Sequence, residues 1–146
     1  MNWLLSSHRI GNVFGIDVRL SYALYLVTGI WAASDLTGPY PLLALVTLLL
    51  PGFVFLHELG HSLMALQHRV PVEEILLHPL GGLARLGGMV PGPWAEIRIA
   101  LAGPATSLLL AGACYAVMMV TPPDATLLIY VMMRLNLMLA LFNLLP

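Results

Sequence analysis

The sequence predicts an all-α polytopic membrane protein, with about four transmembrane helices and a small membrane-associated β-hairpin between helices two and three. Of its 146 residues, 60% are hydrophobic and only 9% are charged, whereas a soluble domain carries about 25% charged residues. Four segments approach the roughly 20 apolar residues that a spanning helix needs. The stretch between the second and third segments is poorer in apolar residues and contains two Gly pairs.

The predicted helices cover approximately residues 20–33, 41–66, 94–120 and 125–145. The first is short, and Tyr22 and Trp31 are residue types that anchor helix ends at the membrane interface. Arg134 interrupts the fourth; it could pair with an acid, line a water-filled cavity or snorkel to the interface, and the sequence leaves these alternatives open. Residues 1–146 are expected to form a single transmembrane core.

The predicted hairpin occupies residues 69–93, with the sequence RVPVEEILLHPLGGLARLGGMVPGP. Its Gly pairs separate short runs of residues that favour strands, a pattern typical of a β-hairpin or of a re-entrant loop. The segment is too poor in apolar residues to span a membrane. We therefore expect it to pack at the membrane face.

The arginines predict the orientation in the membrane. All but Arg134 lie before the first predicted helix, in the long loop, or at the start of the third helix: Arg9, Arg19, Arg69, Arg85 and Arg98. By the positive-inside rule, the N-terminus, the long loop and the C-terminus are cytoplasmic. The net charge of −1 and the lack of a basic run give no reason to expect a nucleic-acid partner.

One motif carries chemistry: His57-Glu58-Leu59-Gly60-His61, or H-E-x-x-H. Residues i and i+4 lie on one face of a helix, about 6 Å apart along its axis, so both imidazoles can reach one Zn²⁺. Glu58 lies beside them, where it can take a proton from a water without binding the metal. An ionisable group inside an apolar helix is costly and indicates a functional site.

Several further segments flank this motif, and together they resemble the prokaryotic members of the site-2 protease family of intramembrane zinc metalloproteases. The segments are GNVFGIDVRLSYAL, HELGH, HPLGGLARL, ALAGPATSLLLA and NLMLALFNLLP. The resemblance implies a Zn²⁺ cofactor and an integral protein of the prokaryotic plasma membrane. The arginine count places the motif in the cytoplasmic half of the second helix. The resemblance also implies regulated intramembrane proteolysis, the hydrolysis of a peptide bond in or near a transmembrane segment of a membrane-anchored protein substrate.

The same resemblance assigns roles to individual residues. His57 and His61 match the zinc ligands, and Glu58 matches the catalytic glutamate. Gly81 and Gly82 match a loop that presents a strand edge to an unwound substrate. Asn143 matches an asparagine that could hydrogen-bond the developing oxyanion. The A-G-P element, here Gly103 and Pro104, permits close helix contact.

Two departures from the family pattern stand out. The family often has Asn where this chain has Ser107. The third zinc ligand of the family is an aspartate in a D-G element shortly after NLLP, and it is expected beyond Pro146. The chain is therefore expected to be an N-terminal fragment of a longer enzyme, inactive alone if it lacks that ligand.

Two other functions stay open at this point. A non-catalytic membrane scaffold could bind zinc or a partner without cleaving anything, as the absent aspartate would suggest. A metal transporter could use His57 and His61 along a permeation path, although transport sites usually draw ligands from several helices near the midplane. The residues name neither the substrate nor the oligomeric state.

Overall fold

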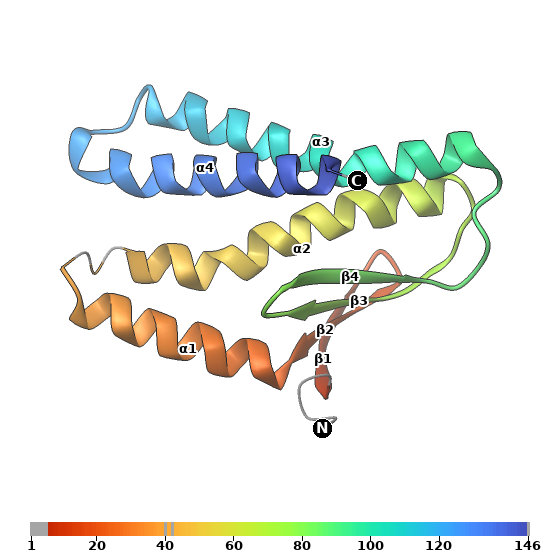
Figure 1. Ribbon diagram of the computed structural model, residues 1–146, viewed down its shortest axis with the longest axis horizontal. Coiled ribbons are helices and arrows are strands. Elements are labelled where there is room, and N and C mark those ends of the chain that lie inside the picture. Colours follow the sequence, from red (N-terminus) through yellow and green to blue (C-terminus); the bar gives the residue numbers. More distant parts are fainter. Residues whose placement is uncertain (1–5, 40, 42, 146) are drawn as a thin grey trace.

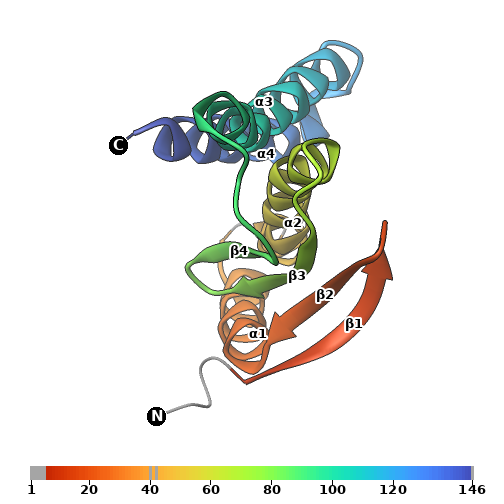
Figure 2. The same ribbon diagram turned by 90° about the vertical axis from the view of Figure 1, so that its right-hand side faces the viewer.

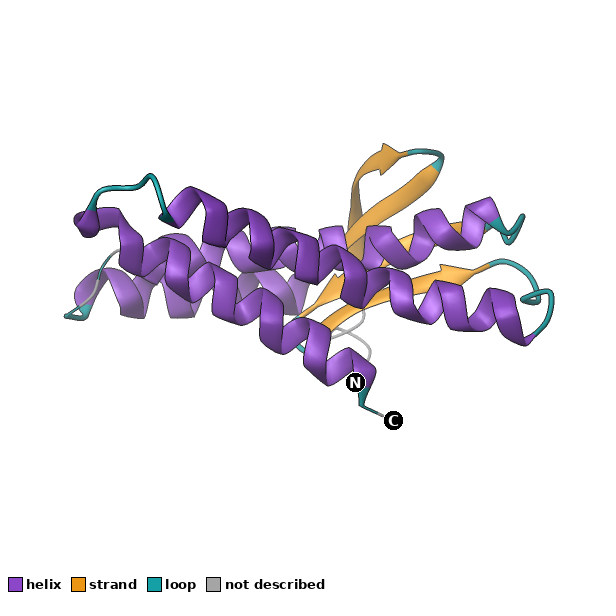
Figure 3. Cartoon of the chain, turned by 90° about the horizontal axis from the view of Figure 1, so that it is seen from above, coloured by secondary structure: helices purple, strands orange, loops and turns teal. Residues whose placement is uncertain are grey.

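The computed structural model describes residues 6–39, 41 and 43–145 (Figure 1). Within this part of the chain the elements follow the order β1 (Ser7–Val13), β2 (Ile16–Ser21), α1 (Tyr22–Thr37), α2 (Leu43–Gln67), β3 (Val72–His78), β4 (Gly81–Leu86), α3 (Pro93–Met118) and α4 (Pro123–Leu144). The expected hairpin is present, because β3 and β4 pair antiparallel. The helices lie roughly along one direction, and the strands gather beside one half of the bundle (Figure 3).

The strands form one four-stranded sheet in the order β1-β2-β3-β4. The all-α prediction is wrong in this respect, since the sequence reasoning left residues 7–21 without strands. Phe14 and Gly15 turn the chain between β1 and β2 with φ values of +53° and +84°, and β2 then pairs in parallel with β3. That parallel pairing joins segments separated by two helices, so no local pattern reveals it. It leaves β1 and β4 as the edges of the sheet.

Three helices, α2, α3 and α4, are long and apolar enough to cross a membrane among the described residues. At most 22% of the most apolar window of each is buried inside the molecule, so most of that apolar surface faces outward, as a bilayer requires. The chain is thus an integral membrane protein. Helix α1 has 16 residues and is about 24 Å long, and it is not one of these three. Helix length and hydropathy therefore indicate three membrane spans among the described residues, where about four were expected.

Helices α3 and α4 lie side by side on one side of α2, and α1 and the sheet lie on the other side (Figure 2). A buried apolar cluster joins the sheet to α1, α2 and α3; its members are Ile16, Leu24, Ala65, Val70, Val72, Ile75, Leu77 and Ile99. This cluster holds the β3–β4 hairpin against the C-terminal half of α2. That half of α2 carries the H-E-x-x-H motif.

Candidate metal centre

The two motif histidines point their ring Nε2 atoms at one another from α2. The Nε2 atoms of His57 and His61 are 3.1 Å apart, and the ring planes are inclined by 75°. Two ligands on one tetrahedral zinc at 2.0–2.1 Å would be separated by about 3.3–3.4 Å. His57 has no exposed surface. The histidine pair therefore has close to the spacing that a shared metal ion requires.

The other ring nitrogens are held by α3. His61 Nδ1 lies 2.7 Å from the Ile99 carbonyl oxygen, which can only accept, so Nδ1 carries the proton and donates it. His57 Nδ1 lies 2.8 Å from the Ser107 hydroxyl oxygen, which can accept or donate. A ligating histidine in proteins is usually oriented in this way through its second nitrogen. The proton on His61 Nδ1 leaves its Nε2 with a free electron pair.

The surroundings of this electron pair fit a cation. Two facing nitrogen lone pairs repel each other unless a proton or a metal ion lies between them. Gly103 of α3 faces the His61 ring, and a Cβ at this position would overlap Nε2 and both ring carbons beside it. The glycine thus keeps open the space next to the atom that would bind metal. The chemistry and the geometry of His57 and His61 fit a zinc ion.

These two residues supply only part of a ligand set. Catalytic zinc usually has three protein ligands and a water. No group of three His, Cys, Asp or Glu side chains that could hold a metal ion occurs among residues 6–39, 41 and 43–145. His78 stays apart from the pair, and its Nδ1 accepts a hydrogen bond from the Leu80 amide.

Glu58 lies between the histidines and strand β4. A Cβ on Gly82 would collide with the Glu58 Cγ, and it would lie 3.0 Å from the carboxylate Oε1. The backbone amide of Ala84, also in β4, hydrogen-bonds the same carboxylate. The hairpin therefore covers the glutamate closely, and it can do so because position 82 has no side chain.

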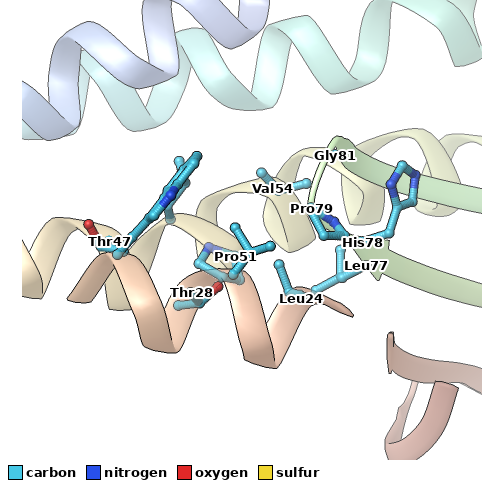
Figure 4. A pocket seen from close by; sticks show the side chains of 12 residues that line it. Leu24, Thr28, Thr47, Pro51, Val54, Leu77, His78, Pro79 and Gly81 are labelled. Atoms are coloured by element: carbon cyan, nitrogen blue, oxygen red, sulfur yellow. The ribbon is translucent and has the colours of Figure 1, made fainter. Parts of the chain in front are cut away.

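Gly81 and Asn143 occupy different places. Gly81 begins β4 with φ of +138° and lines a separate, mostly apolar cavity between α1, α2 and the hairpin turn (Figure 4). This cavity, of about 50 Å³, also contacts Leu24, Val54 and His78. Asn143 of α4 donates a hydrogen bond to the Leu139 carbonyl, and its side chain interacts with the His57 ring. The structure thus brings Gly82 and Asn143 to the motif and leaves Gly81 beside it.

The sequence reasoning missed the contacts that α3 makes with the histidines. Ile99, Gly103 and Ser107 recur every four residues, so they share one face of α3, and all three touch the histidine pair. Gly60 of α2 allows α3 to approach closely: a Cβ there would collide with the Thr106 hydroxyl and lie 2.9 Å from the Ala102 carbonyl oxygen. The i, i+4, i+8 spacing was visible in the sequence, but which helix it faced was not.

Comparison with known proteins agrees with this geometry. The sequence model of peptidase family M50 matches residues 45–126. A Synechocystis protein named "Putative zinc metalloprotease sll0528" is 38% identical over 94% of this chain and 40% of its own length. The "Zinc metalloprotease MJ0392" of Methanocaldococcus jannaschii is 34% identical over 96% of this chain and 41% of its own length.

The chain spans about 40% of the length of these curated relatives. Among solved structures, a site-2 protease from Methanocaldococcus jannaschii superposes with a TM-score of 0.79 and is 33% identical, covering 97% of this chain and 65% of the other. The family match extends over more than half of the chain and includes the paired histidines of α2. This chain belongs to peptidase family M50, the family of site-2 proteases.

Proposed function

We propose that this chain is the zinc-binding core of an intramembrane metalloprotease that hydrolyses a peptide bond in or near a transmembrane segment of a membrane-anchored protein. The observation that carries the proposal is the pair of converging Nε2 atoms with a carboxylate beside them, inside an apolar helix. The curated relatives named zinc metalloproteases support it. Regulated intramembrane proteolysis is the process in which such cleavage would act.

His57 and His61 would hold the metal through Nε2, and a third ligand would come from outside the described residues. When bound, zinc supplies Lewis acidity that polarises a carbonyl and makes a neighbouring water more acidic. The α3 contacts orient the rings: the Ile99 carbonyl fixes the tautomer of His61, and the Ser107 hydroxyl partners His57.

Glu58 would act as the general base and then as the general acid. Its carboxylate lies against β4, so a peptide aligned along this strand would have its backbone next to it. The carboxylate would take the proton from the attacking water and pass it to the leaving amine nitrogen. A carboxylate already placed beside the scissile bond avoids the entropic cost of bringing a base there.

Strand β4 would receive the substrate. It is an edge of the sheet, and an edge strand offers unpaired backbone groups to an added extended segment. A transmembrane helix must unwind before it can be cut, and pairing with β4 would stabilise the extended form. Gly81 and Gly82 would keep this edge accessible, and Asn143, beside His57, would donate a hydrogen bond to the developing oxyanion.

The membrane arrangement is also part of the proposal. Helix α1 would cross together with α2, α3 and α4, which gives four transmembrane helices in a single core. The arginine distribution would place the N-terminus and the active-site side in the cytoplasm of a prokaryotic cell.

The deciding experiment uses the intact protein in detergent with a reporter that has one transmembrane segment containing helix-breaking residues. Glu58→Gln should reduce cleavage by about 10²–10⁴-fold, the usual effect of losing a general base, while zinc content stays unchanged. Glu96→Gln changes an exposed acid in the first turn of α3 and should leave cleavage intact. Zinc binding without any cleavage by the unmodified protein would favour the scaffold, and zinc flux across vesicles that survives Glu58→Gln would favour a transporter.

A further inference from the structure

The carboxylate of Glu58 lies along the edge of strand β4 that faces away from β3. In the described part of the chain, β4 pairs with β3 alone, and it runs beside α2 (Figure 1). The backbone amide of Ala84 hydrogen-bonds the Glu58 carboxylate, and a Cβ on Gly82 would lie 2.9 Å from the carboxylate carbon. The proposed base is therefore bound to the strand that is proposed to receive the substrate.

The Ala84 amide points away from the sheet. In an antiparallel pair, residues whose backbone groups bond the neighbouring strand alternate with residues whose backbone groups face outward. Ala84 gives its amide hydrogen to Glu58, so it is of the outward kind. Gly82, two residues earlier in the same register, is of the same kind. These two residues thus carry the backbone groups with which β4 can bond a further strand.

The Glu58 carboxylate occupies the place of a substrate carbonyl group. An added strand would lie about 4.7–4.9 Å from β4, and one of its carbonyl oxygens would accept the hydrogen bond of the Ala84 amide. A backbone amide has a single hydrogen to donate, so Glu58 and the added strand compete for it. The two acceptors would also overlap in the space beside Gly82. Pairing of a peptide along β4 therefore displaces the carboxylate.

This displacement affects the residue that the reaction depends on. To act as the base, the Glu58 carboxylate must contact a water at the histidine pair. In the described structure its hydrogen bond goes to β4 instead, while His57 and His61 bond each other and α3. The Ala84 amide thus directs the carboxylate toward the strand, and loss of that hydrogen bond leaves the carboxylate free to turn toward the histidines.

We propose that the Ala84 amide holds Glu58 on the edge of β4 in the substrate-free protein, and that a substrate releases the glutamate by taking this hydrogen bond for its own backbone. Ala84 is then a positioning residue that acts on the base through its N–H. The consequence is selectivity, because only a peptide extended far enough to pair with β4 at Ala84 meets a free base. The inference rests on the proposed function, since it concerns the same base and the same strand.

The first test measures peptide binding to variants that lack the base. Glu58→Gln keeps an acceptor for the Ala84 amide, whereas Glu58→Met has nearly the same size and only a weak acceptor. The probe is a fluorescent peptide of about ten Val and Thr residues, which favour strands, added to the intact protein in detergent and followed by anisotropy. Glu58→Met should bind it about 3–10-fold more tightly than Glu58→Gln, the usual effect of one net hydrogen bond. Equal or weaker binding by Glu58→Met overturns the proposal.

Two controls connect this difference to the Ala84 amide. Ala84→Pro removes the N–H, and an edge strand tolerates proline where the N–H faces outward. With Ala84→Pro present, Glu58→Met and Glu58→Gln should bind the probe equally. The same pair of substitutions at Glu73, an exposed acid of β3 that lies beside Gly87, should also give equal binding. A difference that persists with Ala84→Pro, or that appears equally at Glu73, would refute the role of the amide.

The second test follows cleavage by the protein with Glu58 in place. Ala84→Pro should raise hydrolysis of a fluorogenic dipeptide amide, which is too short to pair with β4, by at least about threefold. The same variant should lower kcat/KM for the transmembrane reporter, because the substrate loses a hydrogen bond, and its zinc content should be unchanged. If the amide only orients Glu58 for catalysis, Ala84→Pro lowers both rates, and the proposal is wrong.

The two tests separate this inference from the proposed function. If the unmodified protein cleaves nothing, the proposed function is wrong, while tighter probe binding by Glu58→Met still supports the exchange at Ala84. If the unmodified protein cleaves the reporter and Glu58→Met binds the probe no better than Glu58→Gln, only the inference fails. Failure of the probe to bind any variant overturns the inference as well, because another segment of the same polypeptide or another group then closes the edge of β4.

Discussion

The residues that shape the histidine pair lie on α3 and bear no resemblance to metal ligands. Gly103 leaves room beside His61 Nε2, and Ser107 and the Ile99 carbonyl hold the Nδ1 atoms. The Ile99 carbonyl fixes the tautomer of His61, and so the atom of that ring that can bind metal, and the Ser107 hydroxyl orients the His57 ring. We therefore expect substitutions of these residues to change zinc affinity more than they change the stability of the fold.

Replacing Gly103 by alanine should weaken zinc binding by at least about tenfold, the usual scale for a disturbed metal-supporting residue. The added methyl group occupies the position of the His61 ring, so the ring must turn away. Competition with a chelator of known affinity measures the effect. Gly112→Ala, on the same helix with nothing within 4 Å of the new carbon, should leave zinc affinity unchanged, and an equal loss there would refute this role.

Replacing Ser107 by alanine should lower zinc affinity by about 10–100-fold. The substitution leaves His57 Nδ1 without its hydroxyl partner in a fully buried site, so the ring loses its orientation. Ser62→Ala is the matched control, because Ser62 is equally buried and its hydroxyl has no hydrogen-bond partner among the described residues. Isothermal titration of zinc into both variants should separate them, and similar affinities would contradict the role of Ser107.

At the scale of the elements, α2 and α3 approach closely because Gly60 faces Ala102 and Thr106. This contact sets the separation of the two helices and therefore the distance from the histidines to Gly103 and Ser107. Strand β4 is seated in a similar way through Gly82. Helix α3 and strand β4 thus both pack closely against α2, one on each side of the motif, and together they form the site.

Gly60→Ala should destabilise the folded protein by about 1–3 kcal/mol, the usual cost of overpacking a tight contact. Relief requires the α3 backbone to move, because the new carbon would lie 2.9 Å from the Ala102 carbonyl oxygen. Unfolding in mixed micelles monitored by circular dichroism measures the change. Gly52→Ala on the same helix meets nothing within 4 Å and should be neutral or slightly stabilising; equal destabilisation would show that helix spacing is not the cause.

At the scale of the whole molecule, the sheet connects the strands β1 and β2 to the candidate site. Ile16 in β2 belongs to the same buried cluster as Val72 and Ile75 in β3, and β3 in turn pairs with β4 beside Glu58. Loss of packing near the start of the chain should therefore loosen the strand that covers the glutamate.

Ile16→Ala should cost about 2–5 kcal/mol of stability, as for other large-to-small changes in a core, because Ile16 is 1% exposed. Ile10→Ala in β1, where the side chain is 51% exposed, should change stability by less than about 0.5 kcal/mol. Hydrogen exchange of the β4 amides supplies the second measurement, and it should accelerate in Ile16→Ala alone. If hydrogen exchange of the β4 amides is unchanged in Ile16→Ala, the packing of the N-terminal strands does not influence the site.

The sequence predicted features that depend on local patterns. Convergence of His57 and His61 follows from helix periodicity, and the β3–β4 hairpin follows from a Gly pair between two strand-forming runs. The β1–β2 strands were missed because β2 finds its parallel partner only after two intervening helices. The roles of Ile99 and Ser107 depend on how α3 is rotated against α2, which is a property of packing between helices.

The parallel pairing of β2 with β3 also restricts how the chain can thread a membrane. Two strands hydrogen-bonded in one sheet lie on the same side of the bilayer, so the segment between them crosses an even number of times. Only α1 and α2 lie between them. If α2 crosses, α1 must cross back despite its 16 residues. Because β3 follows α1 and α2 in the chain, β2 can pair with it only after both helices have been synthesised.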